Sequence, residues 1–399
     1  MLVSLAEPVP AVAAPLLPYQ DPFYEPPPNF EAAAPGTVLR TRPIELNFPS
    51  QARSWQLLYR TTDMFDRPDV TVTTVILPDN VAPDRPLVSV QPFEDASGSD
   101  CVPSYRYQAG SDREPVTSAQ TLYLAQALQR GWVVSVPDFE GRFGHLGVAK
   151  EPGYMILDSV RAAEQFAPLG LGPDTRVGMF GYSGGALASG WAAEMQPHYA
   201  PELNIAGVAV GAPVTDVAAF MRTANGGPFA GIVAAGLASE YAADPAVIAA
   251  LGPHLMPETE AVFRQINSQC LFPIVQHSGF QDGSPYFDRP LDQLLALPEL
   301  NEILSRNSLN GPAPIAPMFI AHAVHDEVVP VTATDNLVQT YCDAGTPVTY
   351  LREQVGEHLS TGFSSLAAGY AWLQQRLPAD APTPTGCSTR TVTSLLLPN

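Results

Sequence analysis

The sequence contains almost no lysine. Lys150 is the one lysine among the 20 lysine and arginine residues of the 399-residue chain. It lies in neither a Walker A phosphate loop nor a Ser-x-x-Lys dyad, which argues against both kinds of site. With 40 acidic residues the net charge is −20 at pH 7, and charge of this sign repels nucleic-acid phosphates and anionic lipid headgroups. We expect no nucleic-acid partner and a neutral substrate, although solubility alone also explains an acidic balance.

Cysteine and long apolar runs are also scarce. The four cysteines show no Cys-x-x-Cys spacing, so the sequence predicts no zinc site and no thioredoxin-type redox pair. Two disulfides and buried thiols are both compatible with this count. The absence of an uncharged apolar run of about 18 residues argues against a membrane span. Residues 1–17 have small residues in an A-x-A arrangement at 11–13 but no basic start. They resemble the end of a signal peptide, so we expect a soluble, secreted protein.

The chain is long enough for a large α/β domain with an insertion, and 46% of its residues are hydrophobic. Residues 1–35 are rich in proline and are expected to form an extended arm. Alternating apolar and polar residues then predict antiparallel strands. Further on, short apolar segments alternate with helix-period segments, which predicts βα units and a mostly parallel sheet. The predicted strands are 38–46, 54–62, 69–78, 86–93, 132–139, 176–180, 204–211, 317–324 and 347–352, and the helices are 119–130, 154–166, 186–195 and 333–345.

About a hundred residues separate the strand at 204–211 from the strand at 317–324, far more than an ordinary crossover needs. Apolar residues at helical spacing in 231–252 and 258–272 make this insertion largely helical. We expect a helical cap over an active site, and a subdomain with no catalytic role is the alternative. The glycine- and alanine-rich stretch 227–239 fits either the passage of a slender chain or tight helix packing. The predicted parts are a core at 36–212, the cap at 213–312, and a second core part with a short tail at 313–399.

The stretch GMFGYSGGALASGWAAE, residues 178–194, places Ser183 between a predicted strand and a predicted helix. A strand, a sharp turn and a helix form the setting of the nucleophile elbow in α/β-hydrolases. Gly181 and Gly185 lack Cβ atoms, which leaves room for the turn. A serine that merely closes a loop is the alternative interpretation. With this context the sequence predicts that Ser183 is a nucleophile.

A serine hydroxyl needs a histidine base, and the histidine needs a carboxylate that fixes its tautomer. Hydrolases of this fold place the acid and then the histidine after late strands, in that chain order. Asp326 follows the strand at 317–324 within HDEVVP, and His358 follows the strand at 347–352 within GEHLS. The sequence therefore predicts Asp326 and His358 as the partners of Ser183.

Other roles for the histidines are weaker hypotheses. A metal site would use His322, His325, Asp326 and Glu327, but strand alternation separates neighbouring side chains, so we expect neither a metal nor another cofactor. The remaining histidines, His145, His198, His254 and His277, are expected to be structural or exposed residues.

The oxyanion of an acyl-transfer reaction needs two hydrogen-bond donors. One donor is normally the backbone N–H of the residue after the nucleophile, here Gly184. The second donor is expected from the loop after the strand at 86–93. That loop reads EDASGSDC in place of the HGGG-type run of many lipases.

Taken together, the motifs resemble those of the secretory lipase family. The matching segments occur in order from about residue 17 to about 373. They are LPYQDPFYEPP, SWQLLYRTT, QPFEDASGSDCVPSY, GYSGGALASGWAAE, YAPELNIAGVAVGAPV, NGGPFAG, HAVHDEVVP and EHL.

This resemblance implies an α/β-hydrolase fold with a helical cap and a Ser183–Asp326–His358 triad that cleaves carboxylic esters such as triacylglycerols. It also implies an oxyanion hole formed by Asp95 and Gly184. An ionised carboxylate repels an oxyanion, so a side-chain role for Asp95 requires the protonated acid, which burial favours. In the alternative, only the backbone N–H of Asp95 contributes.

The resemblance further implies two disulfides, Cys101 with Cys270 and Cys342 with Cys387. The chain stops soon after Cys387, where the family has a longer tail that forms a flap, which puts interfacial activation in doubt. We expect a monomer that acts on an ester or lipid substrate, and a lipid-water interface is one place where such a substrate is available. The alternatives are an esterase or acyltransferase for short or complex esters with the same triad, and a non-catalytic lipid-binding protein.

Overall fold

A computed structural model describes residues 13–111 and 114–397 of the chain. Most of the signal-like stretch predicted at the N-terminus falls in residues 1–12, outside this part. Ten strands form one sheet in the order β1-β2-β3-β5-β4-β6-β7-β8-β9-β10. The strands are β1 Val38–Ile44, β2 Ala52–Thr62, β3 Pro68–Pro78, β4 Leu87–Gln91, β5 Val133–Pro137, β6 Val177–Tyr182, β7 Ile205–Gly211, β8 Met318–Ala323, β9 Val348–Glu353 and β10 Cys387–Val392.

The pairing of the strands follows the predicted division of the chain. Strands β1, β2 and β3 pair in antiparallel fashion, and β3 also runs antiparallel to β5. From β5 to β10 all pairs are parallel. Every residue of β4, β5, β6 and β8 is buried, which explains why these segments read as continuous apolar runs. The predicted α/β fold with a mostly parallel sheet is confirmed.

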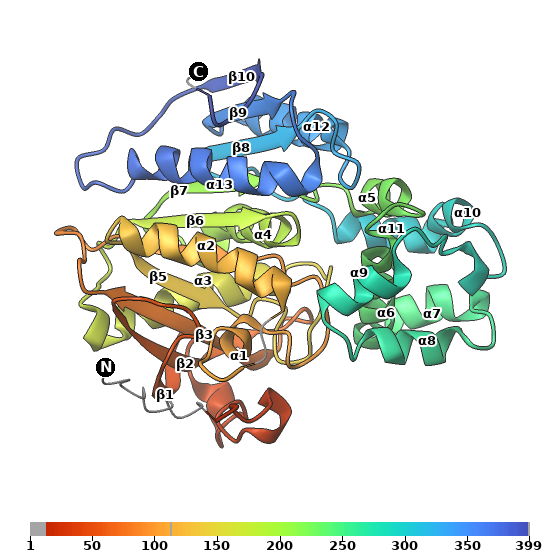
Figure 1. Cartoon of the computed structure of the whole chain (residues 1–399), viewed down its shortest axis with the longest axis horizontal. Helices are drawn as coiled ribbons and strands as arrows, with labels where there is room; N and C mark the ends of the chain where they lie inside the picture. The colour runs from red at the N-terminus through yellow and green to blue at the C-terminus, as the bar shows by residue number, and fades with distance from the viewer. Residues whose placement is uncertain (1–12, 112–113, 398–399) are drawn as a thin grey trace, which may run out of the picture.

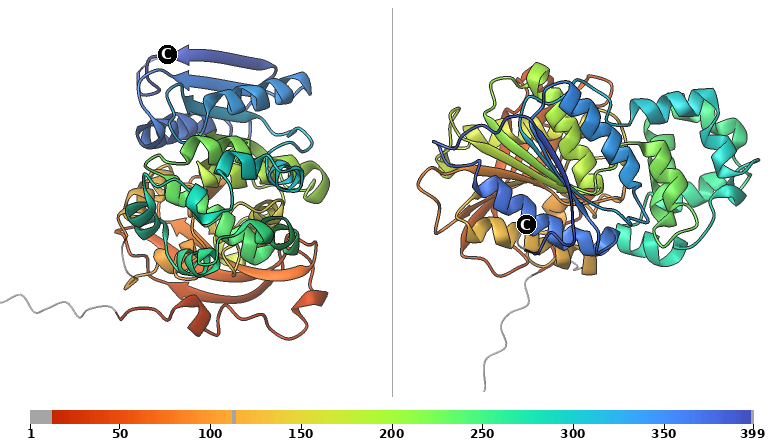
Figure 2. Two further views of the ribbon diagram at one scale, coloured as in Figure 1. Left: turned by 90° about the vertical axis from the view of Figure 1, so that its right-hand side faces the viewer. Right: turned by 90° about the horizontal axis from the view of Figure 1, so that it is seen from above.

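Helices cover both faces of the sheet (Figures 1 and 2). In Figure 1, α2 and α13 lie across the near face, and α3, α4 and α12 lie behind the strands. Side chains of β6 alternate between these layers. Met179 belongs to the core cluster that includes α3 and α4, and Phe180 belongs to the cluster that includes α2 and α13. The helices of this part are α1 Pro103–Arg106, α2 Pro115–Gln129, α3 Glu151–Gln165, α4 Gly184–Tyr199, α12 Val331–Asp343 and α13 His358–Gln374.

Seven further helices lie between β7 and β8 and form a separate group beyond one end of the sheet, at the right of Figure 1. They are α5 Val217–Ala224, α6 Ala230–Ala243, α7 Pro245–Leu251, α8 Thr259–Ile266, α9 Leu271–Ser278, α10 Leu291–Leu295 and α11 Pro298–Arg306. Short 3-10 turns complete the fold at Pro18–Gln20, Phe30–Ala32, Ala167–Leu169, Gly252–His254 and Ser284–Tyr286.

The segment 231–252, predicted to be helical, forms two α-helices and the start of a 3-10 turn, because the chain bends between α6 and α7. Asp244 accepts the backbone N–H of Ala246 at 2.8 Å and caps α7, while Pro245 occupies its first position. Proline lacks the N–H that a continuing helix needs, so it ends one helix and begins the next. The segment 258–272 likewise divides into α8 and the start of α9. Among the described residues no single helix meets the length and hydropathy of a membrane span, although α6 and residues 245–254, bent by 118°, meet them as a pair.

Candidate active site

Ser183 stands on a sharp turn between β6 and α4. Its backbone has φ 54° and ψ −119°, a positive φ that non-glycine residues rarely adopt. A Cβ on Gly181 would lie 2.2 Å from the carbonyl oxygen of Gly185, and a Cβ on Gly185 would lie 2.0 Å from the carbonyl oxygen of Gln91. No side chain fits at either position. Glycine at both positions therefore permits the sharp turn that places Ser183 just beyond the carboxyl end of β6.

The imidazole of His358 joins Ser183 to Asp326. His358 Nε2 lies 3.0 Å from Ser183 Oγ, and His358 Nδ1 lies 2.8 Å from Asp326 Oδ2. His358 is the first residue of α13, and its backbone N–H donates to Glu327 Oε2 at 3.0 Å. The Tyr182 hydroxyl donates to the His358 carbonyl oxygen. Hydrogen bonds at the backbone N–H and at the carbonyl oxygen of His358 therefore help to hold its ring between Ser183 and Asp326.

Asp326 is kept ionised by its surroundings. Its Oδ1 accepts the backbone N–H groups of Val328 and Val329 at 2.9 and 2.7 Å. Burial acts to raise its pKa, but hydrogen bonds from His322 and His358 outweigh burial and hold the pKa well below the usual range. An ionised carboxylate only accepts hydrogen bonds, so the proton on His358 resides on Nδ1 and Nε2 is free to accept the Ser183 proton.

Strands β4 and β6 are parallel neighbours, so the residues that follow them lie at the same end of the sheet. Asp95 follows β4 and Ser183 follows β6, which brings the two residues close together. A Cβ on Gly184 would lie 2.0 Å from Asp95 Oδ1, so the carboxyl group lies directly against that glycine. The backbone N–H groups of Asp95 and Ala96 donate to the buried Glu140 carboxylate. Asp95 also lines both pockets that contain Ser183, with its carboxyl group against Gly184. Gly184 begins α4, so its own N–H has no acceptor within the helix.

Asp95 lies near two other buried acidic residues, Glu94 and Glu140, and burial raises the pKa of all three. Burial raises the pKa of Asp95 to about 6, against the opposing effect of His358. Burial also raises the pKa of Glu94 well above its usual value, and nearby Glu140 and Asp138 raise it further. Neither carboxyl oxygen of Glu94 has a hydrogen-bond partner within the described residues. Burial thus shifts the pKa of Asp95 toward neutral pH and makes its protonated form more accessible.

Two pockets meet at Ser183. The wide pocket, with a volume of about 400 Å³, lies between α2, α9 and the start of α13, and includes His358. Phe272, Leu359 and Phe363 line it and are 41%, 56% and 51% exposed. The narrow pocket, about 50 Å³, runs from Ser183 between α5 and α6. Its walls are formed by Asp95, Leu146, Gly147, Ser183, Gly184, Leu187, Val214, Val217, Phe220, Met221, Ile232, Gly236, Glu240 and Val328.

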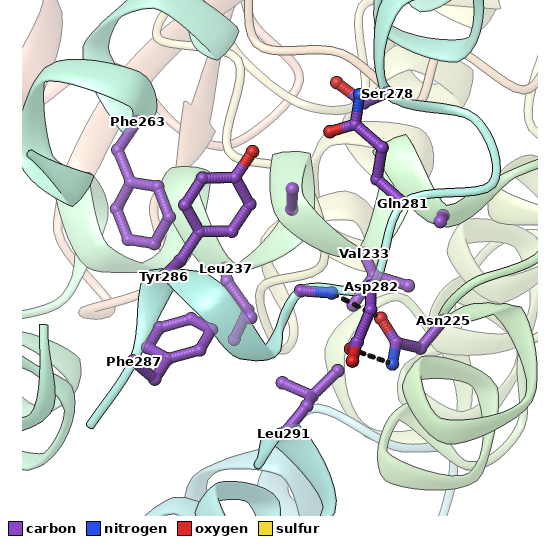
Figure 3. Close-up of a pocket in the computed structure, with 13 residues that line it drawn as sticks. Asn225, Val233, Leu237, Phe263, Ser278, Gln281, Asp282, Tyr286, Phe287 and Leu291 are labelled. Carbon is purple, nitrogen blue, oxygen red and sulfur yellow. Dashed lines mark hydrogen bonds between the residues drawn. The ribbon is translucent and has the colours of Figure 1, made fainter. Parts of the chain in front are cut away.

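A third pocket lies on a different face of α6, among the helices between β7 and β8 (Figure 3). It holds about 20 Å³ and includes none of Ser183, Asp326 and His358. On one side are the aromatic rings of Phe263, Tyr286 and Phe287, and on the other Asn225 donates to Asp282 at 2.8 Å. This pocket is a small gap in the packing and is separate from the serine.

The two disulfides implied by the family resemblance are confirmed, Cys101 with Cys270 and Cys342 with Cys387. The first joins the segment after β4 to the start of α9, on one side of the wide pocket. His145 and His254 pair with Glu151 and Asp288, away from Ser183.

Three residues that support the site were not predicted in these roles. They are His322, which contacts Asp326 at 3.3 Å, Glu327 and Glu140. Glu327 and Glu140 act through backbone N–H groups, which leave no pattern in the sequence. The one available signal was their position next to predicted strand ends.

Comparison with known proteins identifies the family. The secretory lipase family matches residues 108–385. The chain belongs to this family. It is 36% identical to a secreted triacylglycerol lipase, LIP4, of Malassezia globosa, over 91% of this chain and 82% of the relative. It is 39% identical to a Mycobacterium tuberculosis protein named "Probable inactive lipase MT1628", over 91% of this chain and 83% of that protein.

A solved structure supports the same assignment. Candida antarctica lipase A matches with a TM-score of 0.88 and 30% identity, over 95% of this chain and 90% of that chain. The predicted family and the α/β-hydrolase fold are therefore confirmed. The protein is a secreted carboxylic ester hydrolase of the secretory lipase family.

Proposed function

We propose that the protein hydrolyses carboxylic esters of lipids, including triacylglycerols, through an acyl-enzyme on Ser183. The observation that carries this proposal is the continuous chain of contacts from Ser183 Oγ through His358 to Asp326, at 3.0 and 2.8 Å. The exposed apolar side chains around the wide pocket support a lipid ester as substrate, because such side chains are stabilised by contact with an apolar leaving alcohol such as a diacylglycerol.

In the first half of the reaction, Ser183 Oγ attacks the ester carbonyl carbon while His358 Nε2 takes the hydroxyl proton. Asp326 stabilises the imidazolium that forms. The Gly184 N–H and the protonated Asp95 carboxyl donate to the oxyanion. As the tetrahedral intermediate collapses, the bond to the alcohol oxygen breaks and His358 delivers its proton to that oxygen.

In the second half, water replaces the alcohol. His358 takes a proton from a water molecule while the water oxygen attacks the acyl carbon. The bond between the acyl carbon and Ser183 Oγ then breaks. The proton returns to Ser183, and the carboxylic acid is released. No oxidant, reductant or metal is needed for the atoms to balance.

The positions of the two pockets support separate binding of the alcohol and acyl parts of the substrate. The leaving alcohol must lie next to His358, because His358 protonates it, and His358 lines the wide pocket and not the narrow one. The alcohol part therefore occupies the wide pocket. The acyl chain then follows the narrow pocket between α5 and α6, and residues 213–312 act as a cap that houses the acyl chain.

The test is hydrolysis of p-nitrophenyl esters of increasing chain length and of an emulsified triacylglycerol. Ser183→Ala is expected to remain folded and to lose at least about 10⁴-fold in kcat, because the acyl-enzyme cannot form. Ser159→Ala is a matched control, since Ser159 is a buried serine of α3 that donates to the Ile156 carbonyl in its own helix. Retained turnover in Ser183→Ala would overturn the proposal.

A further inference from the structure

Glu240 is a buried acid in the wall of the narrow pocket, and the triad does not use it. Its side chain lines that pocket and the residue is only 2% exposed. Ile232, Gly236 and Glu240 are spaced four residues apart on α6, so they lie on one face of the helix. Ile232 also lines the wide pocket, which places it where the two pockets meet at Ser183. Glu240 therefore stands two helical turns, roughly 12 Å along the axis, beyond that junction.

The carboxyl group of Glu240 is only partly satisfied. The side chain of Asn307 bonds to it, whereas Oε1 has no partner within residues 13–111 and 114–397. A Cβ on Gly147 would lie 3.3 Å from Oε1, so the backbone of Gly147, which also lines the narrow pocket, lies next to the unpaired oxygen.

The charged neighbours of Glu240 are Arg306 and Asp244, and they pair with each other at 2.6 Å. Burial raises the pKa of Glu240 to about 8, opposed by the Asn307 hydrogen bond and by Arg306 and aided by Asp244. At neutral pH the group is therefore a neutral carboxylic acid, which both donates and accepts a hydrogen bond.

We propose that the narrow pocket selects acyl groups that carry a hydroxyl or keto oxygen along the chain, and that Glu240 binds this oxygen. Apart from Asp95 at the serine end, Glu240 is the one acidic side chain among the residues that line the pocket, whose other walls are mainly apolar. A plain alkyl chain leaves the buried Oε1 unpaired, whereas an oxygen on the chain satisfies it. Sites that hydrogen-bond a substrate group reject analogues that lack the group.

This inference rests on the proposed function and on the assignment of the acyl chain to the narrow pocket. Its test compares p-nitrophenyl esters of dodecanoic acid with hydroxydodecanoic and ketododecanoic esters whose oxygen is placed at successive carbons. Each kcat/KM is divided by that of p-nitrophenyl acetate in the same variant, because the acetyl group is too short to reach Glu240.

In the wild type, the oxygen-bearing ester is expected to exceed the plain ester at the chain position that meets Glu240. Glu240→Leu is expected to lower this preference by at least about tenfold, because it removes the partner and the buried polar group together. Glu240→Gln retains a donor and an acceptor of the same shape, so the preference remains. Thermal unfolding of both variants confirms that they are folded.

Two outcomes overturn the inference. One is a wild type with no preference at any chain position, and the other is a preference that Glu240→Leu leaves unchanged, as expected if water alone occupies the site. Failure of the proposed function looks different, because the wild type would then not hydrolyse p-nitrophenyl acetate either.

Discussion

Replacement of Asp95 tests whether a protonated carboxyl serves as an oxyanion donor in this chain. The Asp95 carboxyl lies against Gly184, and its backbone N–H is already bonded to Glu140. Asp95→Asn keeps a side-chain donor that carries no charge, and asparagine tolerates the positive φ of 49° at this position. Asp95→Ala removes the donor. Loss of one oxyanion donor costs about 10²–10³ in kcat, or about 2.7–4 kcal/mol, so we expect Asp95→Ala to lose this much and Asp95→Asn to retain much of the activity.

The pH dependence sharpens this prediction. The pKa of Asp95 is about 6. Above that apparent pKa, the protonated fraction of Asp95 falls about tenfold for each pH unit. The wild-type kcat is therefore expected to decline on the alkaline side, whereas Asp95→Asn, which does not titrate, keeps its kcat over the same range.

The assay is kcat against pH from 5 to 9 with one p-nitrophenyl ester, for the wild type and both variants. Thermal unfolding at each pH separates loss of activity from loss of folded protein. Parallel wild-type and Asp95→Asn profiles would show that Asp95 does not need its proton. An Asp95→Ala variant with unchanged kcat would refute the side-chain role altogether.

Two further predictions concern the support of the site and the stability of the fold. Glu140→Leu removes the acceptor that orients the Asp95 backbone, so we expect kcat to fall about tenfold or more with little change in KM. Glu140→Gln keeps an acceptor and should retain the wild-type kcat. Equal kinetics in both variants would contradict a positioning role for Glu140. Replacing Cys342 and Cys387 together with serine opens a loop of 45 residues, which in the chain-entropy model lowers the free energy of unfolding by about 4 kcal/mol. Denaturant unfolding that shows an unchanged free energy would contradict that estimate.

The sequence predicted the positions of the triad residues better than the contacts that support them. Ser183, Asp326 and His358 each follow a strand, and strand ends are visible as the limits of apolar runs. The sheet topology then brings those ends to one edge. In contrast, Glu140 and Glu327 are held by backbone N–H groups whose direction depends on loop conformations.

Strand β10 shows another limit of the sequence. Its residues 387–391 are exposed and Val392 is partly buried, so no apolar alternation marks it as a strand. It pairs with β9 at the sheet edge, and the Cys342–Cys387 disulfide ties its start to α12. Similarly, Glu240 reads as one polar residue in an apolar helix until the fold places it in the narrow pocket.

Whether Ser183 is an activated nucleophile is the decisive question, because one relative of this chain is named a probable inactive lipase. The most direct measurement is the intact mass of the protein after treatment with a fluorophosphonate, followed by peptide mapping. We expect one adduct per chain, located on Ser183 and absent from both Ser183→Ala and His358→Ala. A folded wild-type protein that gains no adduct, or gains one at a different residue, would contradict the claim.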